Sequence, residues 1–138
     1  MKRILIVLIA SFTMLATVAA QSKIAAREVQ QATNAVATLY QLDETQKEKV
    51  YEIQDRRLRN LAQIEAIKAT DYDTYLLKRR AIQIGTDSAI KRLLNETQLK
   101  IYDAQVAARR QQEVNKMIDL KKQGASKEKI ERALLEIE

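Results

Sequence analysis

The sequence predicts an all-α protein with four long amphipathic helices followed by a short C-terminal helix. The 138 residues contain no proline and only two glycines, the residues that most often interrupt regular structure. The chain is also rich in Ala, Leu, Gln, Glu, Lys and Arg, which favour helices. Apolar residues recur at three- and four-residue steps after several capping signals, the pattern of helices with one buried face.

Residues 1–20 form a separate segment with the three-part layout of a secretory signal peptide. A positively charged start is followed by an uncharged, mostly apolar run over residues 4–18 and by small residues up to Ala20. We expect cleavage after Ala20, so that residues 21–138 fold as a single helical domain outside the cytoplasm. An uncleaved membrane anchor is the alternative, but the apolar run is shorter than the roughly 20 residues that span a bilayer.

The exported domain is expected to be mildly basic, because the loss of Lys2 and Arg3 lowers the formal charge of +6 by two, to +4. Charges of both signs are interspersed along it, which suits solubility and weak attraction of acidic partners rather than a nucleic-acid site. Aromatic residues make up only 4% of the chain, so the core has to consist of aliphatic residues and a few tyrosines. Such a core in so short a chain favours oligomerisation.

The first helix is predicted over about residues 22–40, with Ser22 as its N-cap. Its apolar stripe comprises Ile24, Ala25, Val29, Ala32, Val36, Leu39 and Tyr40. The second helix begins after a capping-box signal in which Asp43 caps the backbone, Gln46 reaches back to it, and Leu42 packs onto the helix. Its stripe comprises Val50, Ile53, Leu58, Leu61, Ile64 and Ile67, with Arg57 inside it.

The third helix is predicted to begin near Thr70 or Asp71, with Thr70 as the cap and Asp73 as the acidic residue three positions on. Its apolar face comprises Tyr72, Tyr75, Leu76, Ile82, Ala89, Ile90 and Leu93. Gly85 interrupts this pattern. Because glycine costs a helix about 1 kcal/mol relative to alanine, Gly85 predicts a bend or a close helix crossing.

The fourth helix is predicted to begin after the pentapeptide Leu94-Asn95-Glu96-Thr97-Gln98, a second capping signal. Its apolar residues are Ile101, Tyr102, Val106, Val114, Met117 and Ile118, with a polar stretch over residues 107–113 between them. Gly124 is the expected C-cap. Ser126 caps a short final helix whose apolar residues are Ile130, Leu134 and Ile137.

The two pentapeptides belong to a longer internal match between residues 42–54 and 94–105. The two segments share Leu, Glu, Thr, Gln, Lys, Tyr and Gln in order, at an offset of 52 residues in the pentapeptide and 51 after it. The slip rotates the later residues by about 100° on a helix, so we expect Tyr51 and Tyr102 to differ in their relation to the core. Two helices that need the same caps could produce the match by shared capping chemistry alone; a pair of related helical hairpins is the sharper interpretation.

A Leu-x-x-x-Gln pentapeptide present twice in an exported, helical, cysteine-free chain resembles the LTXXQ-motif (Spy/CpxP-like) family of periplasmic proteins. The family motif is Leu-Thr-x-x-Gln; this chain keeps both ends and has Asp or Asn at the second position, two residues that also cap helices. The resemblance covers about residues 40–120. The motif residues, expected at helix starts rather than in a catalytic site, are Leu42, Asp43, Gln46, Leu94, Asn95 and Gln98.

The resemblance implies a thin, curved, antiparallel homodimer whose concave face holds unfolded or partly folded client proteins in the periplasm without ATP. From the residues themselves, basic clusters beside the apolar stripes are candidates for client contact, because long basic side chains hold both apolar and acidic segments. These candidates are Arg56, Arg57, Arg59, Lys78, Arg79, Arg80, Arg109 and Arg110. Solvated helix surface is the alternative for each cluster. The tyrosines Tyr51, Tyr72, Tyr75 and Tyr102 are interpreted as packing residues rather than a client surface.

The chain has no histidine and no cysteine, which excludes the usual zinc sites and the Ser-His, Cys-His and Cys-x-x-Cys arrangements. The sequence also has no phosphate-binding glycine loop, and the acidic pair Asp71 and Asp73 suits a helix start. We therefore expect no catalytic site, no cofactor and no histidine-based metal site, with weak carboxylate binding of a metal left open.

Two other non-enzymatic functions stay open at this point. One is a regulatory or structural module that binds a single envelope protein. The other is a membrane-surface protein, which is less favoured because residues 21–138 lack the Trp and Phe that interfacial helices usually carry. We expect no nucleic-acid partner and no stable membrane insertion after signal cleavage.

Overall fold

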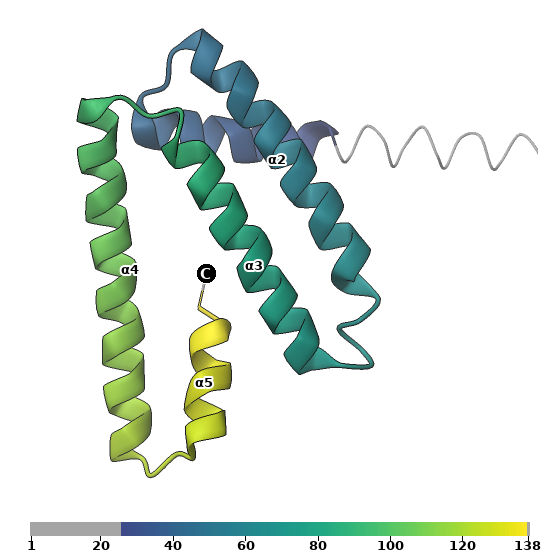
Figure 1. Ribbon diagram of the computed structural model, residues 1–138, viewed down its shortest axis with the longest axis vertical. Coiled ribbons are helices and arrows are strands. Elements are labelled where there is room, and N and C mark those ends of the chain that lie inside the picture. The colour runs from purple at the N-terminus through teal and green to yellow at the C-terminus, as the bar shows by residue number, and fades with distance from the viewer. Residues whose placement is uncertain (1–25, 138) are drawn as a thin grey trace, which may run out of the picture.

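The computed structural model describes residues 26–137, and all regular structure in that range is helical. The helices cover residues 26–40, α2 (Glu44–Glu65), α3 (Tyr72–Lys91), α4 (Glu96–Lys122) and α5 (Lys127–Leu135) (Figure 1). The predicted class, an all-α chain with a short C-terminal helix, is confirmed. The predicted signal peptide, its cleavage site and the cap at Ser22 lie outside the described residues.

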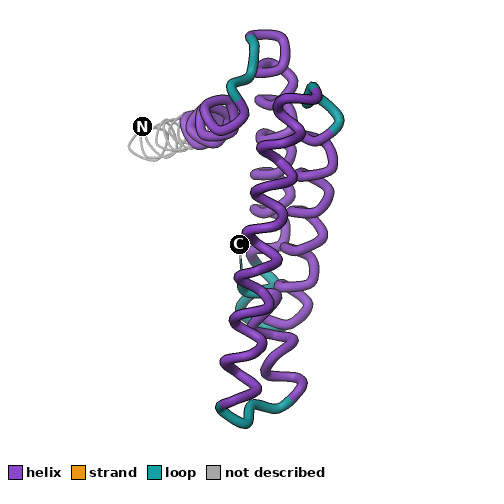
Figure 2. The backbone as a smooth tube through the Cα atoms, turned by 90° about the vertical axis from the view of Figure 1, so that its left-hand side faces the viewer, coloured by secondary structure: helices purple, strands orange, loops and turns teal. Residues whose placement is uncertain are grey.

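The helices form two hairpins, α2–α3 and α4–α5, that lie side by side in one thin layer. α5 lies between the end of α4 and the start of α3 and contacts both (Figure 1). The 26–40 helix crosses one end of the layer, on one side of it, as the edge-on view shows (Figure 2). None of the helices within residues 26–137 is both long and apolar enough to span a bilayer.

Each helix from α2 to α5 begins at a side chain that caps its first turn. Asp43 and Asn95 form complete capping boxes with the residues three positions on, as predicted, and Ser126 caps α5. The start of α3 differs from the prediction: Asp71, not Thr70, accepts the hydrogen bond from the N–H of Thr74, at 3.0 Å. Asp71 prevails because Thr70 belongs to the preceding turn, where its hydroxyl donates to a carbonyl.

The two glycines have different roles. Gly124 ends α4 with φ +71°, and the N–H of Ala125 donates to the carbonyl of Leu120 at 3.0 Å, so the predicted C-cap is confirmed. Gly85 lies within α3, and a Cβ built on it meets no atom within 4 Å. Of the two alternatives predicted at Gly85, the close helix crossing was therefore wrong, because this position faces open space; the bend stays a prediction.

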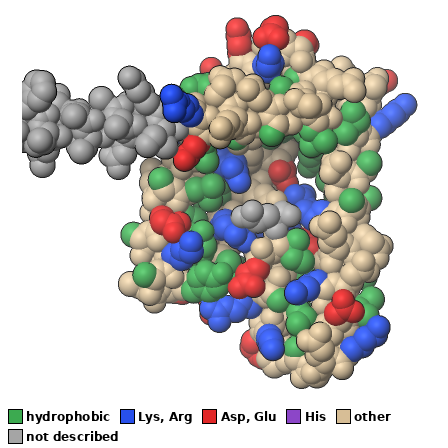
Figure 3. Space-filling view, turned by 180° about the vertical axis from the view of Figure 1, so that it is seen from behind, with side chains coloured by type: hydrophobic (Ala, Val, Ile, Leu, Met, Phe, Trp, Pro, Cys, Tyr) green, Lys and Arg blue, Asp and Glu red, His purple; other side chains and the backbone are tan. Residues whose placement is uncertain are grey.

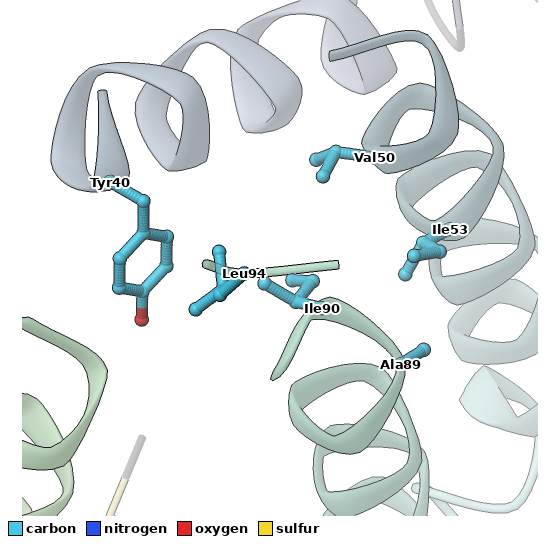
Figure 4. Close-up of a cluster of buried hydrophobic side chains, with 6 residues drawn as sticks. All are labelled: Tyr40, Val50, Ile53, Ala89, Ile90 and Leu94. Atoms are coloured by element: carbon cyan, nitrogen blue, oxygen red, sulfur yellow. The ribbon is translucent and has the colours of Figure 1, made fainter. Parts of the chain in front are cut away.

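Two clusters of buried side chains hold the layer together. The first lies where the 26–40 helix, α2, α3 and the start of α4 meet; it comprises Tyr40, Val50, Ile53, Ala89, Ile90 and Leu94 (Figure 4). The second, at the other end of the α2–α3 hairpin, comprises Ile64, Tyr75 and Leu76, with Leu135 of α5 packed against it. Val50 and Leu76 are fully buried, and burial of such a side chain contributes about 1.5–3 kcal/mol.

α4 is held mainly near its two ends. Of its 27 residues, Gln98 near the start and Leu120 near the end are buried. Val114 and Ile118, which the sequence pattern placed in an apolar stripe, are exposed. That expectation fails because α3 and α4 diverge below their shared turn (Figure 1), and the contact of α4 with α5 leaves Val114 and Ile118 uncovered.

Candidate functional site

The two Leu-x-x-x-Gln motifs meet face to face. Nε2 of Gln46 donates to Oε1 of Gln98 at 2.8 Å, and Nε2 of Gln98 donates to Oε1 of Gln46 at 2.9 Å. Each Oε1 also accepts from the N–H of its own cap, Asp43 at 3.1 Å and Asn95 at 3.0 Å. We call this pair, Gln46 and Gln98, the glutamine clasp. It joins the start of α2 to the start of α4.

The clasp is symmetric in its backbone contacts as well. Nε2 of Gln46 donates to the carbonyl of Leu93, two residues before the cap of α4, at 2.7 Å. Nε2 of Gln98 donates to the carbonyl of Gln41, two residues before the cap of α2, at 3.3 Å. Each glutamine therefore caps its own helix and binds the turn that precedes the other one. The final glutamine of each pentapeptide thus has a tertiary role that capping chemistry alone does not require.

The one-residue slip after the motifs separates the two matching tyrosines, as predicted. Tyr51 of α2 is 37% exposed. Tyr102 of α4 packs against the first core cluster, with its ring centroid 6.4 Å from that of Tyr40. The interpretation of the tyrosines as packing residues is confirmed for three of them, which contact a core cluster: Tyr72, Tyr75 and Tyr102.

Two of the basic candidates bridge α3 and α4. Arg80 of α3 donates to Glu113 at 2.7 Å, and Arg109 of α4 donates to Asp87 at 2.9 Å. All four side chains are only 25–29% exposed. Arg80 and Asp87 lie seven residues apart on α3, and Arg109 and Glu113 lie four apart on α4, so each helix presents one arginine and one carboxylate to the other.

The other basic candidates fall into two groups. Arg79 donates to the carbonyl of Leu135 at the end of α5, at 3.0 Å, and Arg59 forms an exposed intrahelical pair with Asp55. Four side chains form no ion pair within residues 26–137 and stay candidates for client contact: Arg56, Arg57, Lys78 and Arg110. The eight residues therefore do not form one basic surface; part of the set holds the helices together.

Arg56 and Arg57 line a groove of about 520 Å³ between α2 and α3. The groove also contains Ile82 and the open backbone of Gly85, and Arg92 lies at its edge. Apolar and cationic groups thus border the same groove, which suits the binding of a segment that carries both apolar and acidic side chains. Arg57, which interrupts the apolar stripe in the sequence, is half-buried in the structure.

Large aliphatic side chains are left exposed along α3 and α4. Leu77 and Ile84, two turns apart on α3, are 58% and 56% exposed, and Val114 and Ile118 are exposed one turn apart on α4. On the rear face, hydrophobic, basic and acidic side chains are interspersed around a hollow below the 26–40 helix (Figure 3). Within one thin layer these aliphatic groups have no second layer to pack against.

Comparisons of the chain with family models, curated proteins and solved structures give no match. Within residues 26–137, no three acidic side chains gather closely enough to hold a metal ion. The arrangement offers hydrogen-bonding, cationic and apolar groups along open grooves, which are means of binding a polypeptide.

Proposed function

We propose that this chain is a periplasmic, ATP-independent holdase that binds unfolded or partly folded proteins. The observation that carries the proposal is the set of exposed aliphatic side chains on α3 and α4, helices that also carry exposed or half-buried arginines and lysines. An unfolded client presents apolar segments that gain free energy when they leave water, at roughly 25 cal/mol per Å². Basic side chains beside them attract the acidic segments of the same client.

The glutamine clasp supports the proposal indirectly. In the resemblance to the LTXXQ-motif family, the pentapeptides serve as architecture, and here both glutamines bind the opposite turn. The clasp stabilises the end of a thin layer while leaving its faces uncovered. The proposal includes an antiparallel homodimer, because a second copy would enlarge a face that one 138-residue chain provides only in part. Light scattering coupled to size exclusion measures the mass of the particle.

Suppression of aggregation is the direct test. Two unrelated model clients, one acidic and one basic, are diluted from urea with and without the purified protein, and their light scattering is followed. We expect suppression of both at near-equimolar ratios. A module specific for one envelope protein, the alternative, would protect neither client. Absence of suppression at several-fold molar excess would refute the holdase.

The α2–α3 groove permits a sharper test with a matched control. Replacement of both Arg56 and Arg57 by Gln should weaken protection of the acidic client at low salt, and the difference should shrink as salt rises. The control replaces Lys121 and Lys122, exposed in the last turn of α4, by Gln and removes the same charge. Equal protection by the two variants would exclude the groove as a client contact.

A further inference from the structure

A pocket of about 340 Å³ opens between the end of the 26–40 helix, α3 and α4. Tyr40 and Tyr102 contribute aromatic rings to its wall, Val106 an aliphatic side chain, and Asp87 and Arg109 an ion pair. Gln98 of the clasp lies one helical turn before Tyr102 on α4. The pocket therefore lies one helical turn from the glutamine clasp, which joins the starts of α2 and α4.

The hydroxyl of Tyr40 is the most informative group in this pocket. The side chain is only 8% exposed, but its hydroxyl reaches the solvent-accessible surface of the pocket and makes no hydrogen bond to the described residues. Figure 4 shows the ring pointing away from the 26–40 helix, with the hydroxyl at its far end and the other labelled core side chains to one side of it. Burial, and then the nearby charge of Asp87, raise the pKa of Tyr40, so the hydroxyl is protonated at neutral pH and available as a donor.

The ion pair between Arg109 and Asp87 leaves hydrogen-bond donors and acceptors unused in the same pocket. Nη1 of Arg109 donates to Oδ2 of Asp87 at 2.9 Å. A guanidinium carries five N–H donors and a carboxylate accepts at two oxygens, so both groups can make additional hydrogen bonds. Because the two charges already balance, the pocket is electrically neutral while it offers both donors and acceptors.

We propose that this pocket binds the main chain of an extended polypeptide segment. A peptide unit is neutral and carries one N–H donor and one C=O acceptor. Its carbonyl would accept from the Tyr40 hydroxyl and Arg109, its N–H would donate to Asp87, and the neighbouring side chain would pack on Tyr102 and Val106. A charged ligand would unbalance the ion pair, and a purely apolar ligand would take the Tyr40 hydroxyl out of water without replacing its hydrogen bond.

The inference rests on the proposed holdase function and names what the holdase recognises. Contacts to the main chain are independent of client sequence, because every residue except proline carries the same two groups. A pocket of this kind would therefore act on unrelated clients, whereas the basic side chains of α2 select among them by charge.

The test measures binding of a neutral, acetylated and amidated peptide of alternating Val and Ser by the full-length purified protein, using calorimetry. The matched probe is the same peptide N-methylated at alternate residues, which removes N–H donors and keeps the side chains. We expect the N-methylated peptide to bind at least about five-fold more weakly, the effect of one lost hydrogen bond. Equal binding of the two peptides would overturn the inference.

Tyr40→Phe removes only the hydroxyl and should weaken binding of the unmethylated peptide about five-fold. Tyr51→Phe, which changes an exposed tyrosine outside the pocket, is the control and should bind like the parent protein. The aggregation assay is run in parallel. Full suppression by the parent protein and Tyr40→Phe alike, with equal binding of both peptides, would overturn this inference and leave the holdase standing. Absence of suppression by the parent protein would overturn the holdase itself, whichever peptide binds.

Discussion

Removal of the glutamine clasp should destabilise the protein more than any other change of a polar side chain outside the ion pairs. The amide of Gln98 takes part in four hydrogen bonds, to Gln46 in both directions, to the N–H of Asn95 and to the carbonyl of Gln41. Gln98 is only 6% exposed, so water replaces these bonds poorly. At about 0.5–1.5 kcal/mol net for each bond, with partners left partly unpaired, Gln98→Ala should cost about 2–4 kcal/mol of unfolding free energy.

A double-mutant cycle isolates the contact between the two amides. Urea unfolding is followed by circular dichroism at 222 nm for the parent, Gln46→Ala, Gln98→Ala and the double variant. Because two reciprocal hydrogen bonds join the amides, we expect the double variant to lose about 1–2 kcal/mol less than the sum of the single losses. Gln111→Ala, which breaks an exposed pair within α4, is the control and should cost under about 0.5 kcal/mol. Additive losses at Gln46 and Gln98 would refute the clasp.

The remaining predictions concern the glycines, an ion pair and acid stability. Gly85→Ala should raise the free energy of unfolding in urea denaturation by about 0.5–1 kcal/mol, because the added Cβ meets open space in a helix. Gly124→Ala should lower that free energy by about 1 kcal/mol, because φ is +71° there. In a double-mutant cycle with Gln substitutions, Arg80 and Glu113 should couple by about 0.5–1 kcal/mol at low salt and less in 1 M salt. Hydrogen bonding to Thr74 lowers the pKa of Asp71 below its usual 3.8. The stabilisation of the folded state by the Asp71 carboxylate is therefore fully present above pH 3.8 and is lost as the pH falls through the lowered pKa. The urea midpoint should fall less on acidification for Asp71→Asn than for the parent protein.

The starts of the helices could be predicted from the sequence because capping is local. Asp43, Asn95 and Ser126 each bind an N–H three residues away, a distance set by the helix itself. The one error of this kind, at Thr70, arose because two adjacent residues both cap well and the preceding turn decides between them. The helix end at Gly124 was predictable for the same reason, since a left-handed residue is required there.

The contacts between helices could not be predicted, because the periodicity of apolar residues does not indicate which helices lie side by side. Nothing in the sequence pairs Gln46 with Gln98, 52 residues apart, although both residues belong to capping signals. Similarly, the sequence pattern of α3 and α4 is that of solvated arginines, and only the antiparallel placement of the two helices brings Arg80 and Arg109 to carboxylates of the other helix. The exposure of Val114 depends on the divergence of α3 and α4, a property of packing at the turn between them.

The two matching segments differ at one equivalent position, and the proposed binding pocket lies beside that difference. Counted from the caps, Val50 and Tyr102 occupy equivalent positions seven residues into their helices. Val50 is small and fully buried, so it closes its side of the junction. Tyr102 is too large to be enclosed there and lies against Tyr40 instead, which leaves a pocket beside Asp87 and Arg109. The symmetric clasp thus holds the junction together, and the difference between the two copies one turn beyond it provides the space for a ligand.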